Sequence, residues 1–182
     1  MSSLQEAWLS AWRFAARVHH GQTVPGRDLP YLVHLGAVGM EVLVAHQSAP
    51  IEQPELAVQC ALLHDTLEDT QIAETELATL FGPDVLAGVR ALTKNAALPK
   101  ADAMSDSLRR IRAQPHAVWA VKLADRITNL AAPPPAWTDT KIAAYRREAA
   151  HILAELGSGH AVLAERLTQR IAAYPPAVES EW

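Results

Sequence analysis

A short run of histidine and acidic residues, HDTLED at positions 64–69, directly follows the apolar stretch CALL. His64 and Glu68 are four residues apart, as are Asp65 and Asp69, so on a helix each pair would stack along one face. Burying charge at the end of an apolar segment is costly unless a metal or a hydrogen-bond network receives it. The run therefore indicates a site in which metal ligands lie beside two further carboxylates.

Two distant segments carry polar side chains in a similar setting. Asp125 follows the apolar residues VKLA and precedes Asn129 by four positions, and His34 stands in a segment that also contains Val38 and Val42. A lone histidine such as His34 is more often a packed core residue than a ligand, and an adjacent His-Asp pair occurs by chance in many proteins. Polar groups at the ends of three apolar segments could nevertheless reach a common centre, which favours a site over a solvated surface.

The elements that must position these residues are predicted to be helices. Apolar spacing and helix-breaking residues predict helices at 4–19, from 31, from 54 toward 64, near 75–80, and at 84–93, 102–114, 117–130, 138–156 and up to about 174. Gly82 and Pro83 separate two of them, and the PPP run at 133–135 ends another. Thr138 and Ser158 are expected to cap the last two. With no sustained strand pattern, the chain is predicted to be a single all-α domain over residues 1–182.

Composition limits the partners of this domain. The 182 residues are 49% hydrophobic and carry a formal net charge of -4, which argues against a general binder of nucleic acid polymers or membranes. A phosphate-bearing ligand must then be met by a local basic cluster or a metal. No apolar window reaches the ~18–20 residues of a membrane-spanning helix, so a cytoplasmic location is expected. The single cysteine, Cys60, lies in LAVQCALL and is expected in the core.

The order of the motifs resembles a known family. The string HDTLEDT, preceded by PYLVH and followed by FG and then VKLADRITNL, is similar to the HD-superfamily hydrolase domain of RelA/SpoT enzymes and of small alarmone hydrolases. The resemblance covers about residues 8–156, and the spacing makes it more specific than an HD pair alone. It implies an HD-domain helical bundle and a metal-dependent enzyme that removes the 3′-pyrophosphate of a nucleotide alarmone, (p)ppGpp or (pp)pApp, and releases pyrophosphate.

The resemblance also implies a metal centre. By it, His34, His64, Asp65 and Asp125 would bind one divalent metal, usually manganese. The residue types agree, because two imidazoles and two carboxylates make a mixed nitrogen and oxygen site, which suits manganese or a related metal better than a closed thiolate zinc site. Such a metal would activate water and neutralise charge on a phosphate.

The remaining roles concern water and substrate. Glu68 and Asp69 match the acidic pair that handles the attacking water, and as carboxylates they could orient it and take its proton. Asn129 matches an asparagine that contacts the nucleotide. The positions at which the family places phosphate contacts hold Lys100, Lys141 and Tyr145, for which ordinary surface roles stay equally open.

One loop departs from the family pattern. Where the better-known relatives carry adjacent basic residues against a guanine base, this chain reads TVPGR, with Arg27 displaced toward Pro30. Val24 and Pro25 offer neither a stacking cation nor a hydrogen-bond donor for guanine O6, and Arg27 is the substrate contact expected from this loop, over the face of the base. A shift toward adenine alarmones, or broader specificity, is therefore expected.

Two other functions remain open. An HD nucleotidase that acts on a simple nucleotide phosphate would share the metal ligands but does not need the pair Glu68 and Asp69. A catalytically idle nucleotide sensor is less favoured because every expected ligand and both acids are present. Base preference, phosphate number, oligomeric state and protein partners also stay open.

Overall fold

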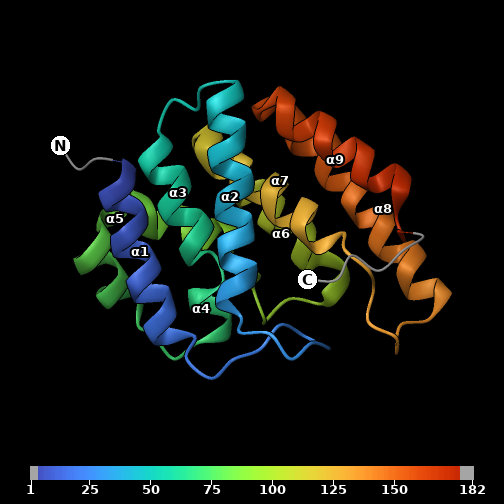
Figure 1. Cartoon of the computed structure of the whole chain (residues 1–182), viewed down its shortest axis with the longest axis horizontal. Coiled ribbons are helices and arrows are strands. Elements are labelled where there is room, and N and C mark those ends of the chain that lie inside the picture. The colour runs from blue at the N-terminus through green and yellow to red at the C-terminus, as the bar shows by residue number, and fades with distance from the viewer. Residues whose placement is uncertain (1–3, 177–182) are drawn as a thin grey trace.

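Helices packed around one core make up the computed structural model of the protein (Figure 1). The structure describes residues 4–176, apart from the side chains of Lys100 and Ala101. Within this range the only extended pairing is an isolated bridge between Thr23 and Pro30, so the all-α prediction is confirmed. The elements are α1 (Leu4–Val18), α2 (Leu32–Ser48), α3 (Pro54–Leu63), α4 (Thr66–Asp69), α5 (Glu74–Leu92), α6 (Lys100–Arg112), α7 (His116–Asn129), α8 (Asp139–Leu156), the 3-10 turn η1 (Gly157–Gly159) and α9 (Ala161–Ala173).

Helix α7 runs through the middle of the bundle. It packs against α2 and α3 on one side and against α8 and α9 on another, and its residues 120–127 are all buried. Each large apolar side chain removed from water here contributes about 1.5–3 kcal/mol before the entropy of folding is subtracted. A polar residue on this segment, such as Asp125, is therefore held in a rigid, water-poor position.

Close packing of α1 against α2 depends on glycine. The rings of Trp8 and Trp12 stack with their centroids 5.8 Å apart and lie against α2. A Cβ atom at Gly39 would come within 2.5 Å of the Trp8 ring, and one at Gly36 within 3.1 Å of the Trp12 ring. Because both positions lack side chains, α2 can approach the tryptophans and carry His34 to its place at the centre.

Several helix ends follow the sequence expectations and one does not. Gly82 takes a φ of +86° and interrupts α5, and Thr138 Oγ1 caps α8 by accepting from Lys141 N at 3.3 Å. The expectation that Ser158 caps the last helix is wrong, because Ser158 lies within η1. His160 caps α9 instead, with Nδ1 accepting from Leu163 N at 3.4 Å.

The structure bears on two further expectations, the burial of the cysteine and the lack of a membrane-spanning helix. Cys60 is fully buried in the core as expected, and burial raises the pKa of its thiol to about 12. Among the described residues, the structure has no helix with both the length and the apolar character needed to cross a bilayer.

Candidate active site

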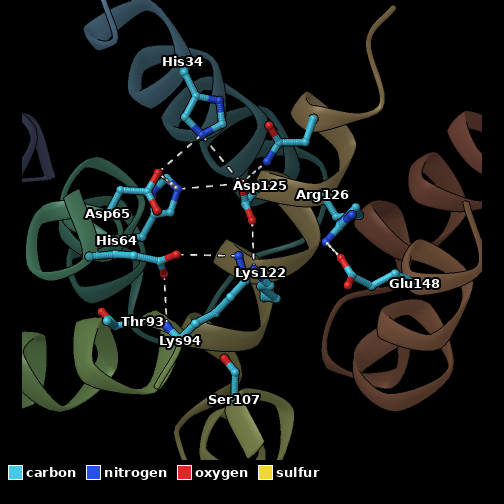
Figure 2. A network of polar contacts seen from close by, with 12 residues as sticks. His34, His64, Asp65, Thr93, Lys94, Ser107, Lys122, Asp125, Arg126 and Glu148 are labelled. Carbon is cyan, nitrogen blue, oxygen red and sulfur yellow. Dashed lines mark hydrogen bonds and ion pairs between the residues drawn. The ribbon is translucent and has the colours of Figure 1, made fainter. Parts of the chain in front are cut away.

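Four side chains that the sequence singled out meet at one point (Figure 2). His34 comes from α2, Asp125 from α7, and His64 and Asp65 from the segment between α3 and α4. Both imidazole Nε2 atoms lie 3.6 Å from Asp125 Oδ1. Asp65 Oδ2 lies 3.0 Å from Nε2 of His64 and 3.8 Å from Nε2 of His34. The structure thus joins residues that are up to 91 positions apart in the chain.

The local backbone explains how two adjacent residues reach the same centre. On one continuous helix, neighbouring side chains point about 100° apart. Helix α3 instead ends at Leu63, Asp65 takes φ -96° and ψ 0°, and α4 starts at Thr66. This short interruption turns both His64 and Asp65 toward Asp125. The predicted end of the helix near residue 64 is therefore confirmed, and Asp69 N donates to Asp65 O at 2.9 Å within the next turn.

The donor atoms fit a divalent metal ion. His64 Nδ1 lies 2.9 Å from Ala61 O, so this nitrogen carries the proton and leaves the Nε2 lone pair free. That Nε2 atom is buried and has no hydrogen-bond partner among the described residues. One ligand atom each from His34, His64 and Asp125 lies within 4.8 Å of the others. A buried, unpartnered imidazole nitrogen beside carboxylate oxygens is the arrangement that a metal would satisfy.

A second layer of polar side chains holds the two carboxylates. Tyr31 Oη donates to Asp65 Oδ2 at 2.5 Å. Lys122 Nζ donates to Asp125 Oδ2 at 3.0 Å, and Asn129 Nδ2 donates to Asp125 Oδ1 at 2.5 Å. These bonds fix the direction in which the remaining lone pairs point, which is how outer partners orient metal ligands.

The electrostatic balance at the centre favours added positive charge. Burial and the neighbouring His64 lower the pKa of His34 below its usual value. Burial alone would also lower the pKa of His64, but Asp65 and Asp125 outweigh it and raise the pKa well above the usual value. Burial opposes ionisation of Asp125, yet the Lys122 ammonium and His64 keep its pKa well below the usual value. The field that favours a proton on His64 would equally favour a dication.

The acidic pair lies at the outer edge of this centre. Burial, together with the negative charges of Asp65 and Glu68, raises the pKa of Asp69. Glu68 is turned toward Lys94, whose backbone N–H donates to Oε2 at 3.0 Å and whose Nζ lies 3.7 Å from Oε1. A carboxyl whose pKa is raised holds a proton more readily, which suits Asp69 to proton exchange.

A chain of contacts from α1 supports the segment that carries Asp69. Gln22 Nε2 donates to Asp69 O at 2.7 Å, and Gln22 Oε1 lies 2.7 Å from His19 Nδ1. The His19 ring stacks on Tyr31, with centroids 5.2 Å apart. His19 Nε2 is buried and has no hydrogen-bond partner among the described residues. The loop after α1 is thereby tied to both the acidic pair and the metal ligands.

A cavity of about 640 Å³ opens beside the centre, with His34 on its wall. This volume is in the range of small-molecule sites. Three of the five predicted substrate contacts line it: Arg27, Asn129 and Tyr145. Lys141 does not line the cavity. Its Nζ lies 4.2 Å from the centroid of the Trp137 ring, and Trp137 does line the cavity. Lys100 begins α6, but its side chain is outside the described part of the structure.

Tyr145 is held in the cavity wall from behind. The guanidinium carbon of Arg126 lies 4.3 Å from the centroid of the Tyr145 ring, and Nη2 donates to Glu148 Oε1 at 2.5 Å. Lys122 and Arg126 flank Asp125 on α7. Both are buried, at 6% and 3% exposure, although a charged residue on a helix is usually exposed.

Comparison with known proteins places the chain in a family. The profile of the family described as "HD domain" matches residues 11–164. The chain belongs to the HD domain family. The matched range contains all four converging side chains and the acidic pair, so the site described above lies entirely within the HD domain.

Relatives of this HD domain include proteins of similar length. The guanosine-3′,5′-bis(diphosphate) 3′-pyrophosphohydrolase MESH1 of Danio rerio is 31% identical over 166 residues, covering 88% of this chain and 90% of that protein. A GTP pyrophosphokinase of Myxococcus xanthus is 36% identical over 129 residues, covering 66% of this chain but 16% of that protein. A solved structure, described as a metazoan ortholog of SpoT that hydrolyses ppGpp, shares 25% identity with a TM-score of 0.81, covering 96% of this chain and 98% of that one.

Sequence reasoning missed three residues that the HD domain places around its centre. None of Tyr31, His19 and Lys122 was predicted as a site residue. A signal for two of them exists in the spacing: Tyr31 precedes His34 by three residues and Lys122 precedes Asp125 by three, which puts each pair on one helix face. His19 has no comparable signal, because it reaches the site only through the turn after α1.

Proposed function

We propose that this HD domain is a metal-dependent 3′-pyrophosphohydrolase of nucleotide alarmones. The observation that carries the proposal is the convergence of two imidazoles and two carboxylates, with an acidic pair nearby, beside a cavity sized for a nucleotide whose wall includes His34. The relative from Danio rerio, which matches over nine-tenths of its length, is named for this activity. The metazoan ortholog of SpoT, similar in fold over nearly the whole chain, is described as hydrolysing ppGpp.

The metal would be held by His34, His64, Asp65 and Asp125. When bound, a divalent cation supplies Lewis-acid chemistry, because it polarises a phosphoryl group and makes nearby water more acidic. Manganese is the metal we propose, since mixed imidazole and carboxylate donors suit it. Tyr31, together with the pair Lys122 and Asn129 on α7, keeps the carboxylate donors aimed at the centre.

The chain's own acid is proposed to move the proton. Water adds to the phosphorus joined to the ribose 3′ oxygen, the bond between that oxygen and phosphorus breaks, and pyrophosphate leaves. Asp69 accepts a proton from the attacking water and can return it to the 3′ oxygen. Its raised pKa suits both steps, and Gln22 holds the backbone of Asp69 in place. Glu68, anchored by Lys94, is proposed to orient the water.

The base preference is a finer proposal. The loop at residues 24–29 lines the cavity with Val24, Pro25 and Leu29, and its only charged lining residue is Arg27. Stacking by one arginine discriminates weakly between purines, whereas hydrogen-bond donors for guanine O6 would discriminate strongly. We therefore propose that adenine alarmones are hydrolysed at least as well as guanine ones. A cytoplasmic setting, without a nucleic acid polymer or a membrane as partner, remains a prediction of the sequence.

A turnover panel with added manganese tests the function. The panel compares ppGpp, pppGpp, ppApp, pppApp, NADPH and ordinary mononucleotides, and it identifies each product. Release of pyrophosphate from 3′-pyrophosphorylated nucleotides alone is the expected result. Phosphate release from mononucleotides would support the HD nucleotidase instead, and binding without turnover would support the sensor. His64→Ala, which removes one metal donor, is the inactive control.

A further inference from the structure

Two arginines of α9 line the cavity at a distance from the metal ligands. Helix α9 starts beside the end of α2, where His160 Nε2 donates to Ala49 O at 2.9 Å. Arg166 then forms two hydrogen bonds with Glu41 of α2, at 2.5 Å and 2.6 Å. Following α9 forward thus corresponds to following α2 backward, and Figure 1 shows that α9 is inclined to α2 and leads away from it. Arg170, one turn beyond Arg166 on α9, lines the same cavity as Glu41 and His34.

The two ends of the cavity are separated by a measurable length of α2. His34 and Glu41 are seven residues apart and both line the cavity. At a rise of 1.5 Å per residue they are about 10 Å apart along the helix axis. Arg166 pairs with Glu41 at the far end of this span, and Arg170 lines the same cavity. A nucleotide whose 3′ group is at the metal site would place its 5′ group across a comparable span.

The charges at the α9 end are not balanced. Among the described residues that line the cavity, Glu41 is the only acid, and Arg166 already pairs with it. Arg170 is half-buried, lines the cavity and has no ion pair or hydrogen bond within the described part of the chain. The rest of the cavity wall is largely apolar and includes Ala131 and Pro133. An unpaired guanidinium in such surroundings, in a chain of net charge -4, favours an anionic ligand.

We propose that Arg170 forms a subsite for the 5′-phosphate groups of the substrate, with Arg166 held beside it by Glu41. The inference rests on the proposed function, because it places the 3′-pyrophosphate at the metal ligands and then follows the cavity to its other cationic end. Arginine is suited to this role because its planar fork donates two parallel hydrogen bonds to phosphate oxygens. The α9 subsite, meaning Arg166 and Arg170, would let the enzyme distinguish substrates by their 5′ end.

The test compares two substrates that share one base and a 3′-pyrophosphate but differ at the 5′ position. One carries a 5′-diphosphate and the other a 5′-hydroxyl. The ratio of their kcat/KM values is measured for the wild type, Arg170→Gln, Arg170→Lys and the control Arg13→Gln, which removes an exposed charge on α1. The wild type and the control should favour the 5′-diphosphate by about tenfold or more, the scale of one charge-assisted contact.

Arg170→Gln should lose most of this preference while keeping its turnover of the 5′-hydroxyl substrate, which also shows that the variant is folded. Arg170→Lys should keep part of the preference because the charge remains. An unchanged ratio in Arg170→Gln, or an equal loss on both substrates in a folded variant, overturns the subsite. If the wild type hydrolyses neither substrate, the proposed function fails. In that case calorimetry tests the subsite separately, by comparing the affinities of a nucleoside 5′-diphosphate and of the nucleoside alone. If wild type and Arg170→Gln bind the 5′-diphosphate with equal affinity, the subsite is overturned.

Discussion

Replacing Lys122 by methionine should destabilise the metal-free protein far more than an ordinary surface change. The side chains of Lys122 and Asp125 are 7% and 8% exposed, and their charged atoms are 3.0 Å apart. At an effective dielectric constant near 20, two unit charges at this distance attract by about 5 kcal/mol. Removing Lys122 leaves the buried Asp125 with only part of its compensation, from His64 and Asn129, and breaking a buried pair in this way costs about 3–5 kcal/mol. Native stability is only about 5–15 kcal/mol, so this loss is large.

The assay is thermal and urea unfolding in the presence of a chelator. For a chain of this length, each kcal/mol corresponds to a shift in Tm of about 2–4 °C, so Lys122→Met should lower Tm by about 10 °C. Lys141→Met is the matched control, because Lys141 is exposed and its Nζ lies over the face of the Trp137 ring. Its effect should stay below about 1 kcal/mol. A double-mutant cycle with Asp125→Asn isolates the coupling between the two charges.

Manganese should stabilise Lys122→Met more than it stabilises the wild type. A dication beside Asp125 replaces the charge that Lys122 supplied, so adding the metal should raise the Tm of Lys122→Met by more than it raises that of the wild type. The reasoning is refuted if Lys122→Met loses less than about 1 kcal/mol in the chelator, or if metal stabilises both proteins equally. The first outcome would mean that Lys122 is not needed to neutralise Asp125; the second would mean that the metal does not reach this carboxylate.

Three further predictions address the centre and the substrate. Elemental analysis should find one divalent ion per wild-type chain and sharply less metal in His64→Ala and Asp65→Ala. Undiminished metal in both variants would exclude the assigned ligands. Chelation should abolish turnover by the wild type. Glu68→Gln and Asp69→Asn should retain metal yet lose turnover by ~10²-fold or more, whereas near-normal rates in both would place the acid elsewhere. The kcat/KM for ppApp should equal or exceed that for ppGpp at the same manganese concentration; a preference for ppGpp of about tenfold, about 1.4 kcal/mol, would mean that a segment other than the 22–30 loop recognises guanine.

Local features of the fold were predictable because they depend on neighbouring residues. The break at Gly82 needs a positive φ that glycine adopts without strain, and the cap at Thr138 needs only a hydroxyl three residues before a free N–H. The end of α3 near His64 followed from an apolar run giving way to acids. The set of polar residues at the centre could also be chosen from the sequence, because a charge placed beside an apolar segment demands a partner.

The partners themselves were decided only by tertiary packing. The residues next to Lys122 in the sequence do not show that this part of α7 lies in the middle of the bundle. The sequence therefore could not distinguish a buried Lys122 bonded to Asp125 from a surface charge. His160 replaces Ser158 as the cap of α9 because its second nitrogen also reaches Ala49, 111 residues away. Likewise, only the packing of α9 against α2 places Arg170 in the wall of the cavity that contains His34. Side-chain type and spacing determine which residues could do chemistry, whereas distance, burial and local charge arise from contacts between helices far apart in the chain.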